Sequence, residues 1–222
     1  MKQFLLIHVS PRKKGTSAML TSRCREYLES RGHTVLVTEL YTNLNHLKEI
    51  AAAAATADTI LFCGPCYINT YPADVYALLK ELYAQRASFH GQKIYGIIQG
   101  GMPYPHTHEN GLKALELFAK KAGLRYMGGF VMGLGAMLNG QPLEKLLNAK
   151  KVIPQLNLFF SHMEKGEESP RQVYQASKLR LPGLLCHLMA RMANKKIDKD
   201  LKKHGIDPKK PSPYLSLDSS LP

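Results

Sequence analysis

Residues 4 to 17, FLLIHVSPRKKGTS, decide the fold of this chain. They open with an apolar, partly β-branched run that stops at Pro11, continue with hydroxyl and basic residues around Gly15, and lead into a helical pattern from about Ser17. This order predicts a strand, a polar loop and a helix. The first amides of a helix have no internal partner and carry partial positive charge, so an anion in this loop would be stabilised.

The side chains of this loop suit a phosphate group. Ser10, Thr16 and Ser17 offer hydroxyl donors, Arg12 can form paired hydrogen bonds with phosphate oxygens, and Gly15 permits a tight turn. A basic surface loop that ends in an ordinary helix cap is the alternative. The loop lacks the Gly-Lys-Ser/Thr of a P-loop and the three glycines of a dinucleotide fingerprint. A mononucleotide or flavin phosphate is therefore the more natural ligand.

Length and composition indicate one globular α/β domain with an appendage. The chain has 222 residues, of which 45% are hydrophobic and 21% charged. The apolar run near the N-terminus is too short for the core of a signal peptide, and no later run approaches a membrane span. Four cysteines without a framework spacing suit a reducing compartment. We therefore expect a soluble cytoplasmic protein.

The formal net charge of +13 implies attraction to anions such as nucleic acid, anionic lipid or phosphorylated cofactors. Much of the excess lies in the last third, in the pairs Lys195-Lys196, Lys202-Lys203 and Lys209-Lys210. Such pairs more often form a solvated helix face than a recognition surface. The sequence contains no helix-turn-helix, zinc-finger or aromatic RNA-binding signature, so nucleic-acid binding is a minor hypothesis.

Hydrophobic periodicity predicts five strands that alternate with five helices. The strands are expected at residues 4–9, 34–38, 59–63, 93–98 and 125–132, and the helices at 18–30, 44–54, 72–82, 110–122 and 142–163. Alternation of this kind predicts the α/β class, with a doubly wound five-stranded parallel sheet covered on both faces. Residues 1–163 are expected to form this domain.

Residues 164–222 are expected to form a basic, helical C-terminal extension whose tail, from Pro208, is extended or disordered. An amphipathic stripe within it contains Leu184, Leu185, Leu188, Met189 and Met192. Packing of this stripe on the parent domain is the first interpretation. A second subunit, the shielding of a site and a membrane surface are the alternatives.

Three loops of unusual composition leave the ends of predicted strands, at residues 10–17, 64–71 and 99–108. In a doubly wound sheet, ligands bind outside the carboxyl ends of the strands, so these loops are expected to converge. The second loop offers flat apolar surface and, at residues 66–68, backbone amides predicted to be free for the edge of a heterocycle. The third loop has Gly100 and Gly101, which permit close approach to a flat ligand.

Three motifs carry a resemblance to a known family: Ser-Pro-Arg-x-x-Gly-Thr-Ser from residue 10, Pro65-Cys66-Tyr67 with Pro72, and Gln99-Gly100-Gly101. Over residues 3 to about 163 the chain resembles the NAD(P)H-dependent FMN reductase and quinone reductase family of the flavodoxin-like superfamily. The resemblance implies a strand order of 2-1-3-4-5, FMN as cofactor, NAD(P)H as co-substrate and a homodimer. It also implies a cofactor site formed by Ser10, Arg12, Gly15, Thr16, Ser17, Pro65, Cys66, Tyr67, Ile68, Gly100, Gly101 and Met102.

The implied activity transfers hydride from a nicotinamide donor, through flavin N5, to a quinone-like or other electron-poor small molecule. It needs no catalytic side chain and no metal ion, because the cofactor carries the chemistry. The amides at residues 66–68 would stabilise negative charge on the reduced flavin. A flavodoxin-like electron carrier is the alternative, against which the basic charge counts. A further alternative is a domain that uses this fold to bind another phosphorylated ligand or a macromolecule.

Two short motifs suggest competing chemistry. Cys63-Gly64-Pro65-Cys66 resembles the redox motif of thioredoxin, but Cys63 ends a predicted strand where that motif would begin a helix. His106 and His108 could suggest a metal site, but side chains at i and i+2 point apart on a strand. We expect this segment to form a loop rim, with Thr107 or His108 capping the next helix.

Overall fold

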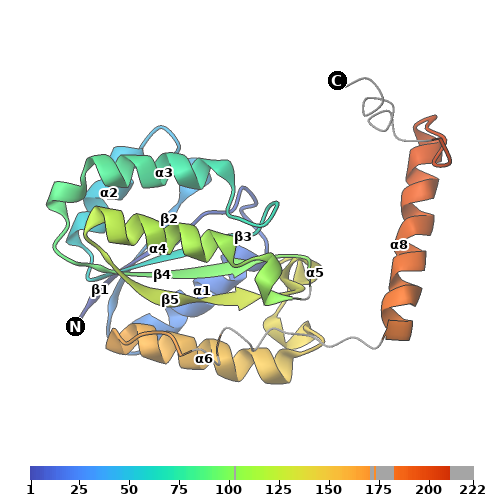
Figure 1. The fold of residues 1–222 in the computed structure, drawn as a ribbon. Helices are drawn as coiled ribbons and strands as arrows, with labels where there is room; N and C mark the ends of the chain where they lie inside the picture. Colours follow the sequence, from blue (N-terminus) through green and yellow to red (C-terminus); the bar gives the residue numbers. More distant parts are fainter. Residues whose placement is uncertain (103, 171–172, 174–182, 211–222) are drawn as a thin grey trace. The chain divides into compact units, whose positions relative to one another are not determined.

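Five parallel strands form one sheet in the order β2-β1-β3-β4-β5 (Figure 1). The structure is a computed structural model that describes residues 1–102, 104–170, 173 and 183–210. The strands are β1 (Gln3–His8), β2 (Thr34–Glu39), β3 (Thr59–Pro65), β4 (Lys93–Gln99) and β5 (Arg125–Met132). The predicted α/β class and the strand order 2-1-3-4-5 are confirmed.

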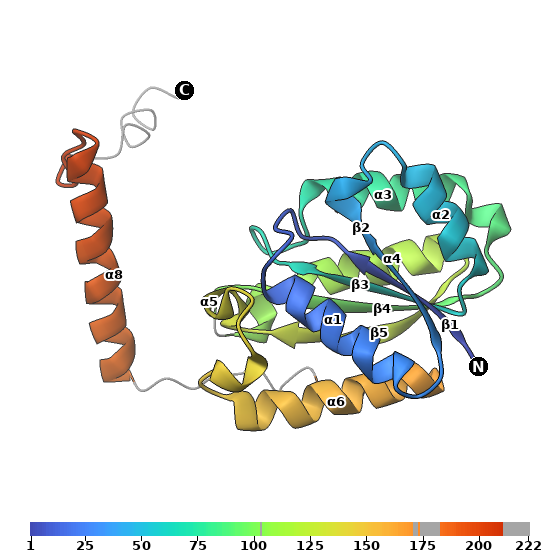
Figure 2. The ribbon, with the colours of Figure 1, turned by 180° about the vertical axis from the view of Figure 1, so that it is seen from behind.

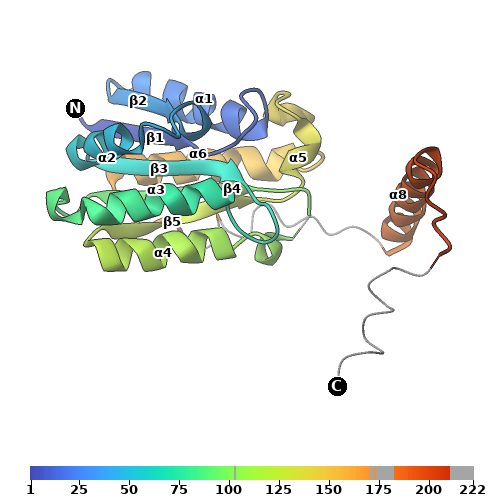
Figure 3. The ribbon, with the colours of Figure 1, turned by 90° about the horizontal axis from the view of Figure 1, so that it is seen from above.

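Helices cover both faces of the sheet (Figures 2 and 3). One layer contains α1 (Thr16–Glu29) and α6 (Ala149–Lys165), and the other contains α2 (Leu47–Thr56), α3 (Ala73–Ala84) and α4 (Asn110–Ala122). In β1, Leu5 and Ile7 join the core beneath the second layer, whereas Phe4 and Leu6 join the core beneath the first. Side chains of a strand alternate between the two faces, so a strand with cores on both sides is apolar at every position.

The segment between β5 and α6 differs from the prediction of one helix over residues 142–163. It contains a short helix, α5 (Gly135–Leu138), and a turn, η4 (Leu143–Lys145), and α6 begins only at Ala149. Leu134 and Asn139 adopt left-handed backbone conformations, with φ of 58° and 47°, and so delimit α5. Burial of Leu143 anchors the turn. The remaining single-turn helices are η1 (Leu40–Thr42), η2 (Arg86–Ser88) and η3 (Pro105–Thr107).

The second predicted helix is also shorter than expected. It begins at Leu47, and Leu44 lies before it with 40% of its surface exposed. The apolar stripe of this helix therefore starts at residue 47, with Ile50, Ala51 and Ala54 as its buried members.

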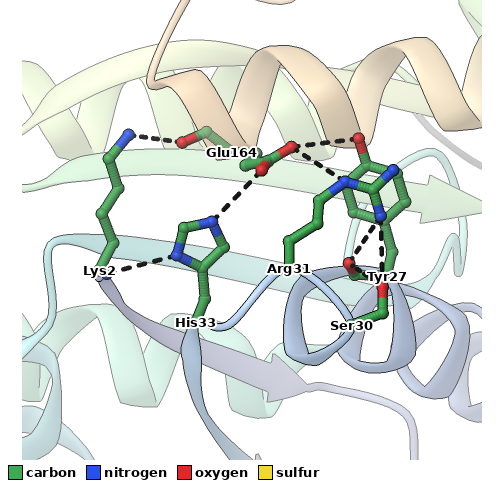
Figure 4. A network of polar contacts seen from close by, with 6 residues as sticks. All are labelled: Lys2, Tyr27, Ser30, Arg31, His33 and Glu164. Carbon is green, nitrogen blue, oxygen red and sulfur yellow. Dashed lines mark hydrogen bonds and ion pairs between the residues drawn. The ribbon is translucent and has the colours of Figure 1, made fainter.

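A polar network around Glu164 joins the end of α6 to the end of α1 and the start of β2 (Figure 4). The Glu164 carboxylate accepts a hydrogen bond from the Tyr27 hydroxyl (3.2 Å) and lies 3.4 Å from Arg31 Nε and 3.3 Å from His33 Nε2. The Arg31 guanidinium also lies over the Tyr27 ring, 3.6 Å from its centroid. These contacts hold α6 against the sheet.

The chain divides into two compact units, Met1–Leu179 and Arg180–Pro222. Contacts beyond residue 163 extend the first unit: the Tyr95 hydroxyl donates to the Glu167 carbonyl (2.7 Å), Ser169 N donates to the Met127 carbonyl (2.7 Å), and Val173 is buried. The second unit contains α8 (Gly183–Lys203).

The predicted extended tail lies, from residue 211 on, outside the described residues. Within the described part of the chain, no helix combines the length and the hydropathy needed to cross a membrane.

Candidate functional site

A cleft opens where the carboxyl ends of β1, β3 and β4 meet α5. Its cavity has a volume of about 140 Å³. It is lined by Ser10, Arg12, Gly15, Thr16, Ser17, Pro65, Cys66, Tyr67, Gln99, Gly100, Gly101, Ala136 and Asn139. The three loops that the sequence singled out therefore converge on one place, as expected for ligand sites in doubly wound sheets.

The loop after β1 presents an anion-binding geometry. Helix α1 begins at Thr16 with Gly15 as its N-cap, and no side chain among the described residues caps it. Its first turn contains no acidic residue, and Arg12, Lys13 and Lys14 are exposed just before it. Uncapped amides at a helix N-terminus, together with neighbouring cations, favour a bound phosphate or carboxylate.

The three predicted hydroxyl donors of this loop do not have equal freedom. The Ser10 hydroxyl accepts from Arg12 N (3.2 Å) and the Ser17 hydroxyl accepts from Gln99 Nε2 (3.2 Å), so each can still donate its proton to a ligand. The Thr16 hydroxyl, by contrast, donates to the Gly135 carbonyl (2.7 Å). Thr16 can therefore serve an anion through its backbone amide, while its side chain holds α5 against the loop.

The α5 segment forms a wall of the cleft that sequence reasoning missed. Asn139 Oδ1 accepts from Arg12 Nη1 (3.5 Å), and Gly140 N donates to the Thr16 hydroxyl (3.5 Å). A Cβ on Gly140 would lie 3.2 Å from the Gly15 Cα, so the two loops approach closely at this glycine. The glycines and asparagine of Gly133-Leu134-Gly135 and Asn139-Gly140 are residues that indicate turns in a sequence. The contact between this segment and Thr16 has no such signal in the sequence.

The loop after β3 corrects the prediction of free amides at residues 66–68 for two of them, Cys66 and Tyr67. Cys66 N donates to the Gln99 carbonyl (2.6 Å), which continues the ladder between β3 and β4, and Tyr67 N donates to the Thr70 carbonyl (2.7 Å) within a tight turn. These two amides are thus committed to the fold and cannot stabilise charge on a ligand. Pro65, Cys66 and Tyr67 nevertheless line the cleft.

Ile68 and Met102 are the two predicted site residues that do not line the cleft. Ile68 is 99% exposed and adopts a left-handed conformation with φ of 48°, which is costly for a β-branched residue. Met102 is 56% exposed, and its carbonyl accepts from Leu134 N (3.1 Å) and lies 3.0 Å from His108 Nε2. Ile68 and Met102 follow the lining residues Tyr67 and Gly101 in the chain, so these two and the half-exposed Tyr67 give the surroundings of the cleft exposed apolar side chains.

The two glycines after β4 have different surroundings. A Cβ on Gly100 would lie 2.5 Å from Cε1 of the buried His108 ring, whereas the nearest atom to a Cβ on Gly101 is 3.9 Å away. Gly100 is therefore required by the packing of His108, and Gly101 leaves open space at the cleft. The predicted capping of α4 by Thr107 or His108 is wrong, because Glu109 is the N-cap and neither Thr107 nor His108 caps the helix with its side chain.

The cysteine pair of the Cys-x-x-Cys motif is divided between the two faces of the sheet. Cys63 lies in the core beneath α1 and α6, where burial raises the pKa of its thiol to about 12, and Cys66 packs against the opposite core. Burial also raises the pKa of the Cys66 thiol. Both sulfurs are free thiols with raised pKa values, which opposes the reactive thiolate that dithiol exchange requires.

A second hollow, of about 250 Å³, lies along the edge of β5. Its lining includes Glu109 and Glu116, together with Lys113, whose ammonium group lies 2.6 Å from the Glu109 carboxylate. Two carboxylates against one lysine give this hollow none of the cationic character of the cleft beside α1.

The donor set of the cleft fits the phosphate end of FMN. It supplies the amides that begin α1, the hydroxyls of Ser10 and Ser17, and the Arg12 guanidinium. Sites that bury a whole ligand usually have volumes of about 300–1,000 Å³. The cavity of about 140 Å³ is smaller than this, so it can enclose only part of a ligand of the size of FMN.

Comparisons with solved structures identify proteins of the same fold. An NADH:FMN oxidoreductase matches with a TM-score of 0.61 and 20% identity, over 81% of this chain and 97% of its own. An NAD(P)H:quinone oxidoreductase from Methanothermobacter marburgensis matches with a TM-score of 0.52 and 14% identity, over 73% of this chain and 96% of its own. A short-chain flavodoxin matches with a TM-score of 0.53 and 16% identity, over 75% of this chain and 99% of its own. The chain therefore has the flavodoxin-like fold.

No protein-family model matches the sequence. No curated protein matches it either.

Proposed function

We propose that this protein is an FMN-dependent NAD(P)H oxidoreductase that reduces a quinone-like or other electron-poor small molecule. The observation that supports it most strongly is the convergence of three strand-end loops on one cleft, with an uncapped and cationic helix N-terminus at one side. Two proteins of the same fold are named for reactions that involve FMN or quinones with NADH or NAD(P)H. FMN, when bound, would supply the hydride chemistry between the two substrates.

The residues of the chain would bind and orient this cofactor. The α1 amides, Ser10, Arg12 and Ser17 would hold the phosphate, and the segment Pro65 to Tyr67 would support the ring from one side. Gly101 would allow the ring close to the backbone, because nothing lies within 3.9 Å of a Cβ there. Since the Cys66 and Tyr67 amides are already bonded, hydrogen bonds that tune the electronics of the flavin ring would have to come from other donors.

The open rim would give the substrates access to the flavin. Tyr67, Ile68 and Met102 expose 45%, 99% and 56% of their surfaces, and apolar side chains of this kind suit a flat nicotinamide or quinone. The donor would bind first and leave, and the acceptor would then occupy the same place. The excess of basic residues would favour a phosphorylated donor through long-range attraction.

A homodimer and a cytoplasmic location belong to the same proposal. A second copy placed over the exposed rim would cover its apolar side chains, which can be tested by light scattering coupled to size-exclusion chromatography. The four cysteines of the chain, scattered without the spacing of a disulfide framework, are compatible with a reducing compartment.

An electron carrier is the second candidate function, because a flavodoxin shares this fold. Carriers that dock on basic partners benefit from an acidic face, whereas this chain has a formal net charge of +13. Direct reduction by a nicotinamide separates the two functions, since a pure carrier needs a separate reductase.

The test is visible spectroscopy of the purified protein after addition of FMN and desalting. We expect a retained flavin band that bleaches when NADPH or NADH is added under argon and returns when a soluble quinone is added. A retained band that neither nicotinamide bleaches would identify a carrier. Failure to retain FMN would refute the proposed function.

A further inference from the structure

Within its own compact unit, helix α8 presents large apolar side chains that no described residue of that unit buries. None of its residues is buried, and Leu184, Leu188 and Met192 expose 86%, 57% and 66% of their surfaces. Leu185 and Met189, on either side of this line, expose 41% and 39%. Scattered exposed leucines are ordinary, but a contiguous row of five marks a surface that binds something.

The apolar and cationic residues of α8 are sorted along the helix axis. Leu184, Leu188 and Met192 follow one another at intervals of four, so they lie on one side of the helix. The same side continues with lysines three, seven and eleven positions after Met192, at Lys195, Lys199 and Lys203. One continuous stripe along α8 is thus apolar in its N-terminal half and positively charged in its C-terminal half.

We propose that α8 binds the surface of an anionic lipid bilayer. Its first half would enter the boundary between the acyl chains and the headgroups, and the lysines of its second half would contact the anionic headgroups.

Charge complementarity selects this occupant. Within α8, six basic residues stand against only two acidic ones. Its stripe therefore needs a partner that places hydrocarbon directly beside a dense layer of negative charge, which the interface of an anionic bilayer does within about 5–10 Å. Lysine stems are long and apolar, so their ammonium groups can reach phosphates while the stems lie at the hydrocarbon boundary.

A second copy of α8 is a poor match for the same stripe. Parallel pairing would place lysine against lysine, and antiparallel pairing would place lysines against leucines. Both arrangements bring together groups that repel or that lose hydration without compensation.

The inference concerns α8 alone and is independent of the proposed flavin chemistry. Its test is co-sedimentation of the full-length protein with vesicles of phosphatidylcholine, with or without about one third phosphatidylglycerol. We expect binding to the anionic vesicles, at least tenfold weaker binding to the neutral ones, and loss of binding at high ionic strength because salt screens charges. Equal binding to both vesicle types, or none to the anionic type, would overturn the proposal.

Two variants separate the two halves of the stripe. The double substitution Leu188→Glu and Met192→Glu should abolish vesicle binding. The triple substitution Lys195→Gln, Lys199→Gln and Lys203→Gln should weaken it on the order of a hundredfold, at about fivefold for each lysine. Vesicle binding that is unaffected by both variants would show that α8 is not the binding element.

Matched controls come from the exposed face of α4. Leu117 is 57% exposed, so Leu117→Glu adds a charge to a similar surface. The triple substitution Lys113→Gln, Lys120→Gln and Lys121→Gln removes three positive charges from exposed positions, the same number as the triple substitution in α8. Both controls should retain vesicle binding to within a few fold of the unaltered protein. If the controls lose as much vesicle binding as the α8 variants, the loss would reflect the net charge of the protein and not α8. Light scattering on each variant detects self-association, and an α8-dependent dimer without vesicle binding would identify a second copy as the occupant.

Discussion

Charge reversal at Arg12 should weaken the binding of FMN by about two orders of magnitude. Arg12 is exposed and lies in the cleft lining beside the start of α1, and among the described residues its side chain makes one long hydrogen bond of 3.5 Å, to Asn139. Its side chain is therefore free to reach a phosphate without breaking the fold. Arg12→Gln removes the attraction between the guanidinium and the phosphate, and Arg12→Glu also adds repulsion between a carboxylate and the phosphate. Comparison of their Kd values therefore separates the two effects.

The magnitude follows from two contributions. A hydrogen bond to a charged group is worth about 1.5–3 kcal/mol, and its loss in Arg12→Gln corresponds to at least about tenfold in Kd. A carboxylate about 5 Å from a phosphate charge repels it by about 3 kcal/mol at an effective dielectric constant of about 20. Screening over this distance, with a Debye length of about 8 Å, reduces that value to about 1.8 kcal/mol, which adds at least about another tenfold in Arg12→Glu.

Quenching of FMN fluorescence gives the Kd of each variant. Arg25→Glu is the matched control, because Arg25 lies on α1 outside the cleft lining, has a side chain that is 54% exposed, and pairs with Glu29 one turn away. This control changes the net charge by the same amount and should leave the Kd within about twofold. The difference between Arg12→Glu and Arg12→Gln should also shrink as ionic strength rises. An unchanged Kd in Arg12→Glu would refute the assignment of the phosphate site.

Two substitutions test the packing beside the cleft, and chemical labelling tests the burial of the cysteines. Thr16→Val should lower the free energy of unfolding by about 1–3 kcal/mol in thermal melts, because it strands the Gly135 carbonyl, whereas Thr16→Ser should retain most of the stability. Gly100→Ala should cost about 1–3 kcal/mol by the same measurement, because its Cβ would meet His108 at 2.5 Å, and Gly101→Ala serves as the control that should cost much less. In the native protein at pH 8, a maleimide should modify the partly exposed Cys66 and Cys186 well before the buried Cys24 and Cys63, and rapid labelling of Cys63 would contradict the burial that raises its pKa to about 12.

The sheet was predictable because its signals are local. Strands buried on both faces appear as short apolar runs, such as residues 59–63, and glycine or proline marks the turns that follow them. Parallel strands that alternate with helices leave few possible topologies, since crossovers are right-handed. The resemblance carried by the loop motifs then supplied the strand order.

The wall formed by α5 was not predictable, because it depends on contacts between distant residues. Pro142 and the apolar positions after it indicated a helix. The segment before it instead forms α5, which is delimited by the left-handed conformations of Leu134 and Asn139 and held by the hydrogen bond from Thr16 to Gly135. The error at residues 66 and 67 has the same origin. Whether an amide is free depends on the neighbouring strand, and here Gln99 on β4 accepts the Cys66 bond.

The most direct test of the central claim is a crystal structure of the protein grown with FMN. We expect the phosphate at the N-terminus of α1, within hydrogen-bond distance of Ser10, Arg12 and Ser17, and the ring beside Pro65 to Tyr67 and Gly101. FMN bound elsewhere, or a cleft that stays empty at saturating FMN, would contradict it.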